Sequence, residues 1–381
     1  MIFSNYSHKN DSFTLIETLI VAAIIIIMTT GAVLEMSSFK NRKTLDLDAQ
    51  QIATALSNAQ SKAIQQEGGT AWGVRFTNGT VDSYQVFQGL SYSTSSVVDS
   101  EQLGLSDSFT NPASGMNLDV IFNQRTGTPV GGSAFVIVIK QNSSNNLYSI
   151  FVSSAGKVST NFETGLVGYW PMDEGSGGTT YDASGNNNNG TITIGSGGTQ
   201  TTVTQAWANA SPSRVGDGLN FDGTDDYADA GNKFSLNIGD NMTVFFWINA
   251  PINNSYQRAI SKNNQGSQGW EIQNSPSSAN VALRLDTSAG LNQCFYINNV
   301  IDSTWHNIAF TISGGLVNIY VDGAIKSNVA YSVGNGLGNS TDLVMAAAYN
   351  YSLPFNEKLN DVRIYNRALS ATEIMNLYNS Y

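Results

Sequence analysis

Charged residues and cysteines are both scarce in this chain of 381 residues. Only 12% of the residues are charged, and the formal net charge is −11. The sequence therefore offers no basic face that could displace counterions from a nucleic acid, and we expect no nucleic-acid partner. Cys294 is the single cysteine, which excludes an intrachain disulfide.

Glycine and aromatic residues are abundant instead. Glycine occurs 36 times, and aromatic residues make up 10% of the chain. This composition is typical of β domains with many turns. The length exceeds what one hydrophobic core normally serves, so we expect two folded domains in addition to any anchor.

One long apolar run, residues 13–34, interrupts the polar composition. As a helix it would rise about 33 Å, close to the thickness of the hydrocarbon layer of a membrane. Glu17 is the only charge in the run, and Lys9 precedes it, which favours a cytoplasmic N-terminus. We predict a transmembrane or assembly helix. A cleaved secretory signal and a plain single-pass anchor are alternatives, but a plain anchor leaves Glu17 unexplained.

The start of this run reads Ser-Phe-Thr-Leu-Ile-Glu from Ser12 to Glu17. It resembles the class III signal of type IV prepilins. The resemblance implies that a prepilin peptidase removes residues 1–12, cutting between Ser12 and Phe13, and that the new amine of Phe13 is methylated. It also implies that Glu17 meets the N-terminus of a neighbouring pilin or pseudopilin during assembly. The family usually has glycine where this chain has Ser12.

A second helix and a sheet are predicted within residues 35–160. Over residues 44–66, apolar residues recur at alternating spacings of four and three, which indicates a one-sided helix. The stripe consists of Leu45, Ala49, Ile52, Leu56, Ala59 and Ala63. Five β-rich runs follow without a helical crossover, which favours antiparallel pairing. These runs are 71–77, 83–88, 117–122, 134–140 and 147–153. The stretch 121–129, followed by a strand, a polar turn, a second strand and residues 155–158, resembles the end of an H-type minor pseudopilin domain.

Residues 161–165 are predicted to be a polar linker, and a new domain to occupy 166–381. Seven segments of this domain resemble, in order, the concanavalin A-like, laminin G type jelly roll. They are residues 166–177, 181–190, 219–227, 242–248, 305–311, 319–323 and 359–370. Ser370 and Glu373 form a capping box that predicts a short closing helix. We therefore predict an α+β pilin-like domain, with a long N-terminal helix packed on an antiparallel sheet, followed by an all-β concanavalin A-like jelly-roll sandwich.

The second domain offers oxygen ligands for calcium rather than a pair of catalytic groups. Glycoside hydrolysis requires two facing carboxylates, but Glu271 stands alone, and His306 is the only histidine outside the leader. We therefore expect that this chain is not an enzyme. The family resemblance implies that Asp173, the 182–188 loop with Asp182 and Asn188, and Asp361 converge on a structural Ca²⁺. The alternative is that these residues only form turns. Trp207 and Trp270 are candidates for ligand binding.

The complete interpretation is a type IV pilin-like or pseudopilin-like filament subunit that displays a lectin-like adhesive domain for carbohydrate or another surface ligand. Before assembly it would cross the bacterial inner membrane once, with the C-terminal domains periplasmic or extracellular in a pilus or pseudopilus. One alternative is a minor pseudopilin of a type II secretion system that contacts exported substrate. A second is a surface-anchored carbohydrate-active enzyme acting through Glu271.

Overall fold

The computed structural model describes residues 43–380 except for residue 133, 144–145, 209–217, 254, 265–267, 288–291 and 333–336. The described residues from Leu45 onward form one compact unit. The predicted leader, the residues Ser12, Phe13 and Glu17, and the apolar run 13–34 all lie outside the described residues.

No helix in the described part of the chain combines the length and the apolar character needed to cross a bilayer. On this finding, the predicted localisation, a single pass through the inner membrane, is wrong, and we withdraw it.

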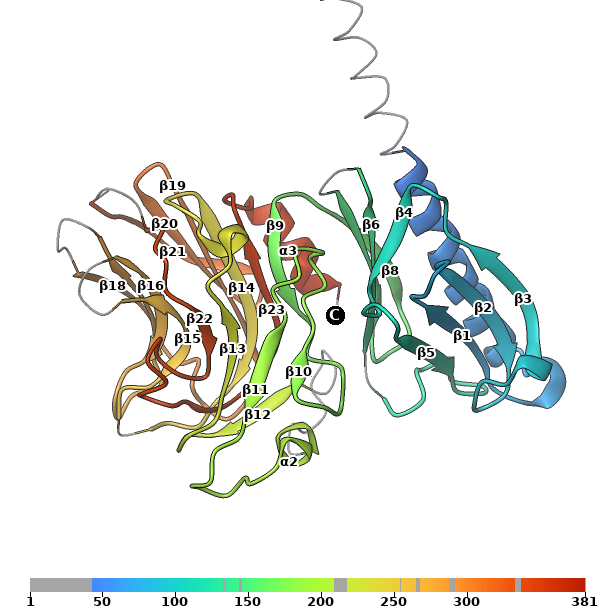
Figure 1. Cartoon of the computed structure of the whole chain (residues 1–381), viewed down its shortest axis with the longest axis horizontal. Coiled ribbons are helices and arrows are strands. Elements are labelled where there is room, and N and C mark those ends of the chain that lie inside the picture. The colour runs from blue at the N-terminus through green and yellow to red at the C-terminus, as the bar shows by residue number, and fades with distance from the viewer. Residues whose placement is uncertain are drawn as a thin grey trace, which may run out of the picture. The chain divides into compact units, whose positions relative to one another are not determined.

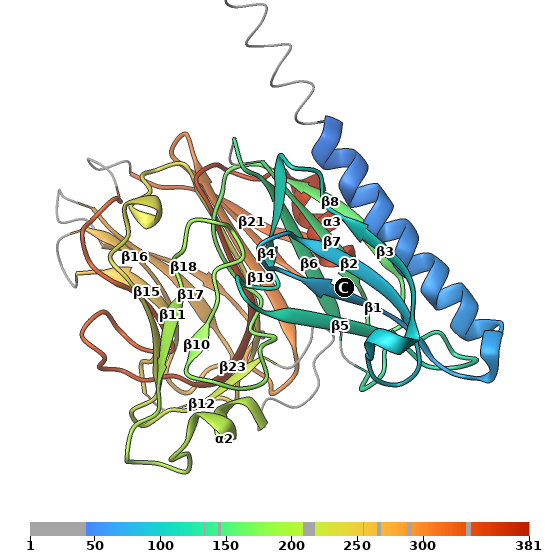
Figure 2. The same ribbon diagram turned by 45° about the vertical axis from the view of Figure 1, so that its right-hand side comes forward.

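A helix over residues 43–64 opens the described chain, and the predicted stripe along it is confirmed. All six stripe residues, from Leu45 to Ala63, are 0% exposed. They pack on strand residues such as Val74, Phe122 and Ile137 in one hydrophobic cluster. Figure 2 shows the helix lying along these strands. The sheets cover this face of the helix, because the apolar side chains lie on it.

Two four-stranded antiparallel sheets cover the helix. The first has the order β3-β2-β1-β5, with β1 (Trp72–Thr77), β2 (Ser83–Gln88), β3 (Val97–Gln102) and β5 (Asn117–Phe122). The second has the order β4-β6-β7-β8, with β4 (Asp107–Asn111), β6 (Phe135–Gln141), β7 (Leu147–Val152) and β8 (Val158–Glu163). The short 3₁₀ turn η1 (Glu67–Gly69) lies between the helix and β1, and η2 (Thr94–Ser96) lies between β2 and β3. An α+β arrangement is therefore present in this half.

The five predicted strands correspond to β1, β2, β5, β6 and β7, but β3, β4 and β8 were not predicted. β8 includes part of the segment 161–165, which was expected to be a linker. Its sequence is mostly polar, and it becomes a strand because it pairs along its whole length with β7. Pairing with a neighbour, rather than intrinsic propensity, decides such a strand.

Residues 166–380 form an all-β sandwich of two antiparallel sheets (Figure 1). The eight-stranded sheet contains, in spatial order, β10 (Thr179–Thr180), β11 (Gly190–Thr193), β13 (Tyr227–Gly231), β22 (Leu343–Met345), β15 (Arg258–Asn263), β16 (Gly269–Asn274), β17 (Val281–Asp286) and β18 (Asn292–Ile297). The other sheet contains β12 (Leu219–Asp222), β23 (Asn356–Tyr365), β14 (Met242–Asn249), β19 (His306–Ser313), β20 (Leu316–Val321) and β21 (Ala324–Ala330), with β9 (Leu166–Trp170) paired to β23. Their facing sides enclose the largest hydrophobic cluster among the described residues.

Three short helical elements complete the sandwich: α2 (Val203–Ala208), η3 (Phe234–Leu236) and α3 (Ala371–Asn379). The predicted capping box of α3 is confirmed, because the Ser370 hydroxyl accepts from the Glu373 amide and the Glu373 carboxylate accepts from the Ser370 amide. Ile374 and Leu377 then pack on the outer face of the sandwich sheet that contains β14 and β19.

That outer face also joins the sandwich to the first half of the unit. Val138 and Phe151, from β6 and β7, share one buried cluster with Tyr169, Phe245 and Trp247 of the sandwich. The two halves therefore have a common hydrophobic core in addition to their separate ones.

Candidate functional site

Asp182 and Asn188, two of the predicted calcium ligands, do come together in one loop. The Asp182 carboxylate accepts from the backbone amides of Tyr169, Ser184 and Asn188, each at 2.9 Å. The Asn188 side chain donates to the Val167 carbonyl at 2.7 Å. These groups fold the loop onto β9, and the carboxylate oxygens that calcium would need are already occupied by amides.

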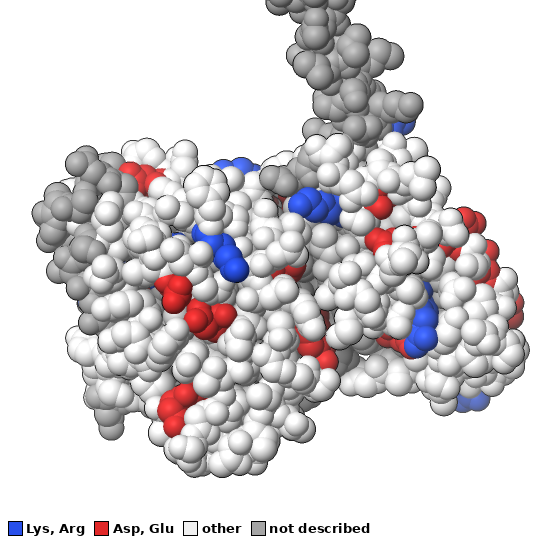
Figure 3. Space-filling view, viewed as in Figure 1, with Lys and Arg blue, Asp and Glu red and all other residues white. Residues whose placement is uncertain are grey.

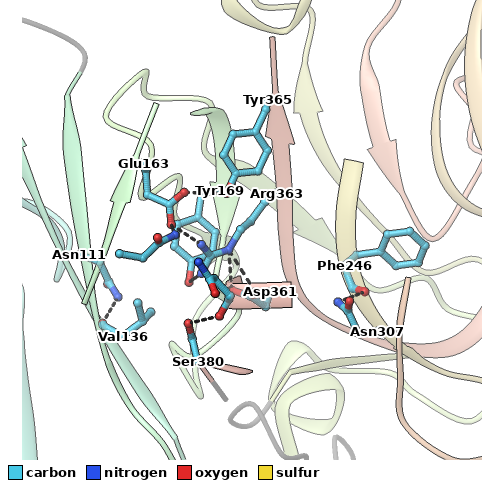
Figure 4. Close-up of polar contacts among 12 residues, drawn as sticks. Asn111, Val136, Glu163, Tyr169, Phe246, Asn307, Asp361, Arg363, Tyr365 and Ser380 are labelled. Atoms are coloured by element: carbon cyan, nitrogen blue, oxygen red, sulfur yellow. Dashed lines mark hydrogen bonds and ion pairs between the residues drawn. The ribbon is translucent and has the colours of Figure 1, made fainter. Parts of the chain in front are cut away.

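Asp361 lies elsewhere, in a buried ion network between the two halves (Figure 4). It accepts from Arg363 at 3.1 Å, and Arg363 also donates to Glu163 of β8 at 2.7 Å. Tyr169 and Tyr365 complete the network through their hydroxyls, at 2.8 Å from Arg363 and 2.7 Å from Glu163. The Arg363 guanidinium therefore pairs with the Asp361 carboxylate. The predicted residues do not fit a shared calcium site.

The remaining predicted residues are also separated. Asp173 lines a small cavity of about 190 Å³ next to Glu174. Burial raises the pKa of Glu174 to about 7. Trp207 and Trp270 are only 3% and 1% exposed and belong to the sandwich core. We therefore assign both tryptophans to packing rather than to a ligand.

Three carboxylates that the sequence did not single out lie close together on the sandwich. Oxygens of Asp222, Asp225 and Asp226 are within 4.8 Å of one another. Asp222 accepts from the amides of Thr199 and Gln200, and Asp225 accepts from that of Gly197. These hydrogen bonds hold the glycine-rich loop 195–200 in place.

A pocket of about 550 Å³ lies where β18 and β21 end their respective sheets, and we call it the edge pocket. Tyr296 comes from β18, Asn298 and Asn299 from the turn after it, His306 from the start of β19, and Lys326 from β21. Its volume lies within the range of roughly 300–1,000 Å³ that is usual for small-ligand sites.

Tyr296 gives the edge pocket an exposed aromatic surface. It is 52% exposed, whereas its neighbours Phe295 and Ile297 point into the core, as the alternation of a strand requires. The flanking amides of Asn298 and Asn299 are exposed and can both donate and accept hydrogen bonds. An aromatic ring beside such amides can stack on the apolar face of a sugar and bind its hydroxyls.

His306 is fixed in the wall of the edge pocket by two carboxylates. Its Nδ1 is 3.0 Å from Asp322 Oδ2, and its Nε2 is 3.3 Å from Asp302 Oδ2. Burial acts to lower the pKa of His306, but the hydrogen bonds to Asp322 and Asp302 outweigh it, and the pKa is raised. Asp322 is held in turn by the β20–β21 hairpin, where Asp322 and Gly323 have positive φ, as this tight turn requires.

The hydroxyl of Thr304 is 3.1 Å from His306 Nε2, which gives a Thr–His–Asp arrangement like that of a hydrolase. Thr304 Oγ1 is, however, 2.6 Å from Asp302, and both imidazole nitrogens face carboxylates. Because the Thr304 hydroxyl donates its hydrogen to Asp302, the imidazole is not placed to take that hydrogen.

Glu271, on which the enzyme alternative depends, is fully buried. Arg258 Nε lies 2.9 Å and Arg284 Nη1 3.4 Å from the same carboxylate oxygen. A register shift in β15 between Arg258 and Ile260 puts Arg258 on the same face as Glu271. The carboxylate is therefore paired with two arginines inside the protein.

Residues 222–375 match a family model described as the concanavalin A-like lectin/glucanases superfamily. The second half of the chain contains a concanavalin A-like domain. The edge pocket lies within the matched residues of this domain. No curated protein sequence matches the chain.

Solved structures similar to the chain include the binding domain of Paraclostridial Mosquitocidal Protein 1, with 19% identity and a TM-score of 0.45, covering 57% of this chain and 52% of that one. The botulinum neurotoxin serotype G binding domain has 18% identity and a TM-score of 0.43, covering 56% of this chain and 50% of that one. The chain spans about half the length of these structures.

Sequence reasoning missed Tyr296, Asn298, Asn299 and Lys326. The only local signal was the alternation of Tyr296 with two apolar residues, followed by two asparagines that favour a turn. Lys326 lies 30 positions from Tyr296, and only the sandwich brings β18 and β21 to the same edge.

Proposed function

We propose that this chain is a carbohydrate-binding protein whose concanavalin A-like domain takes a neutral sugar into the edge pocket. The observation that carries the proposal is the exposed ring of Tyr296 beside Asn298, Asn299 and Lys326 in a pocket of about 550 Å³. The match to a superfamily that includes lectins supports it. On the face drawn in Figure 3, charged side chains are scattered among uncharged ones, which suits recognition by neutral polar groups.

The test is a titration of the full chain with glucose, galactose, mannose and N-acetylglucosamine. We expect at least one sugar to bind. Tyr296→Ala should weaken that binding about tenfold or more, since it removes an exposed aromatic anchor. Phe234→Ala is the matched control, because Phe234 is 96% exposed and lies outside the pocket. If none of the four sugars binds, or if both variants lose sugar binding equally, the edge pocket is rejected as the sugar site.

We further propose that the first half is a pilin-like or pseudopilin-like base, and that the chain assembles with other pilins after cleavage by a prepilin peptidase. The one-sided helix with its fully buried stripe, covered by two antiparallel sheets, supports this proposal. The resemblance of the segment from Ser12 to Glu17 to the prepilin signal supports it independently.

Mass spectrometry of the N-terminus tests this second proposal. Coexpression with a prepilin peptidase should yield a chain that begins with N-methylated Phe13. Glu17→Ala should be cleaved normally but should lose incorporation into filaments. An intact Met1 in the presence of an active peptidase would contradict the proposal.

A further inference from the structure

A cleft of about 730 Å³ lies between the two halves of the described chain. One wall comes from the first half, from 78–82, 103–110 and the end of β6, and the other from 181–189 of the sandwich. Both walls belong to the single compact unit 45–381.

Two hydrogen bonds join the walls of the cleft. Thr110 Oγ1 donates to the Ala183 carbonyl at 2.6 Å, and Lys140 Nζ donates to the Gly185 carbonyl at 3.0 Å. Gly185 is required at this contact: it has φ 76°, and a Cβ there would lie 2.6 Å from Lys140 Cδ. The width of the cleft is therefore set by direct contacts between the halves.

Uncharged hydrogen-bonding side chains line both walls of the cleft. Ser108 and Asn142 come from the first half, and Tyr181, Asn187 and Asn189 come from the sandwich. Asn142, Asn187 and Asn189 are exposed. Asn142 Oδ1 accepts from Ser108 at 2.7 Å and Asn189 Oδ1 accepts from the Asp182 amide at 2.9 Å, so these two side chains would meet a ligand through their NH₂ groups. Amides, a hydroxyl and a phenol together suit a ligand with many hydroxyl groups.

The acidic residues of the cleft do not change this chemistry. Asp82 accepts from the amides of Gly79 at 3.1 Å and Phe109 at 2.7 Å. Asp182 is occupied by three amides, as described above. Asp107, the third carboxyl of the lining, is only 5% exposed and lies against Asp48, so it presents little negative charge to the cleft. A cationic ligand would therefore meet few accessible carboxylate oxygens there.

We propose that the cleft is a second saccharide site, which takes a short neutral oligosaccharide and is built jointly by the pilin-like base and the concanavalin A-like domain. It rests on the proposed function, because it assumes that the chain binds carbohydrate. It adds that the base is part of the binding surface: the cleft is larger than the edge pocket, at about 730 Å³ against 550 Å³, and one of its walls is missing from the sandwich.

The experiment titrates the full chain with tetrasaccharides of glucose, galactose, mannose and N-acetylglucosamine, and separately with the four monosaccharides. Asn142→Ala changes only the base, and Tyr181→Ala changes only the sandwich. Each should weaken tetrasaccharide binding about tenfold and leave monosaccharide binding unchanged. Tyr296→Ala should weaken monosaccharide binding about tenfold and leave tetrasaccharide binding unchanged.

The outcomes separate the two proposals. If neither Asn142→Ala nor Tyr181→Ala weakens tetrasaccharide binding while Tyr296→Ala still removes monosaccharide binding, the cleft is rejected and the edge pocket stands. If no saccharide binds the unmodified chain, both are rejected. Asn142 is exposed, so its variant decides the question even if Tyr181→Ala fails to fold; Tyr181→Phe, which removes only the hydroxyl, then replaces it.

Discussion

Arg363 is a fully buried cation whose guanidinium is shared between two carboxylates from the two halves. Removing one partner of a buried ion pair leaves an uncompensated charge, which costs about 3–5 kcal/mol. We therefore expect Arg363→Met to lower the free energy of unfolding by about that amount, because Glu163 and Asp361 would remain buried without their cation.

Urea unfolding measures this effect. Lys233→Met is the control, since Lys233 is exposed, and it should change stability by less than about 0.5 kcal/mol. If Arg363→Met were no worse than Lys233→Met, the network would have no stabilising role.

Asp107 is a buried carboxyl next to Asp48, and it makes stability depend on pH. Burial and the contact with Asp48 raise the pKa of Asp107 from 3.8 to about 7. Between these values the folded chain holds a proton that the unfolded chain has lost. The free energy of unfolding should therefore fall as the pH rises from about 4 to about 7. Glu174, whose pKa is raised to about 7, should add to the same fall.

Asp107→Asn keeps the shape of the side chain but cannot ionise. We expect it to flatten the fall in stability and to be more stable than the unmodified chain at pH 8. Combination with Glu174→Gln should flatten it further. Chemical denaturation at several pH values measures the slope, and an unchanged slope in the double variant would contradict the assignment.

At the scale of elements, the helix α3 depends on Ser370, the N-cap residue that directly precedes it. Ser370 accepts from the Glu373 amide, and Glu373 is paired with Arg367 at 2.6 Å. The hydrogen bond from Arg367 is the main cause that lowers the pKa of Glu373 to about 2. Loss of an N-cap hydroxyl costs about 1 kcal/mol, so Ser370→Ala should destabilise the protein by that amount.

Thr372→Ala is the matched control, because Thr372 lies in the same turn, is exposed and is not the cap. Thermal unfolding compares the two variants. Equal effects would show that the cap contributes nothing beyond helix propensity.

At the scale of the whole molecule, the two halves should unfold together. Val138 and Phe151 of the first half share a buried cluster with Tyr169 and Trp247 of the sandwich, and the Arg363 network lies across the same boundary. Unfolding either half alone would expose this shared apolar surface to water. We therefore expect one cooperative transition in urea, with fluorescence and circular dichroism giving the same midpoint. Two separated transitions would contradict a shared core.

How much the sequence could predict depended on the range of the interaction. The stripe from Leu45 to Ala63 and the capping box at Ser370 were predicted because spacing within one helix determines which side chains share a face. The strands β3, β4 and β8 were missed because their sequences are polar and become strands only through their partners.

The sequence by itself determined the local elements and the all-β character of the second half, since periodicity, turn residues and caps act over a few positions. Only the tertiary structure decided which polar residues meet. It paired Asp361 with Arg363 instead of with Asp182, buried Trp270, and brought Tyr296 to the same edge as Lys326. The reason is physical: contacts between distant segments depend on how the sheets stack, which no short stretch of sequence encodes.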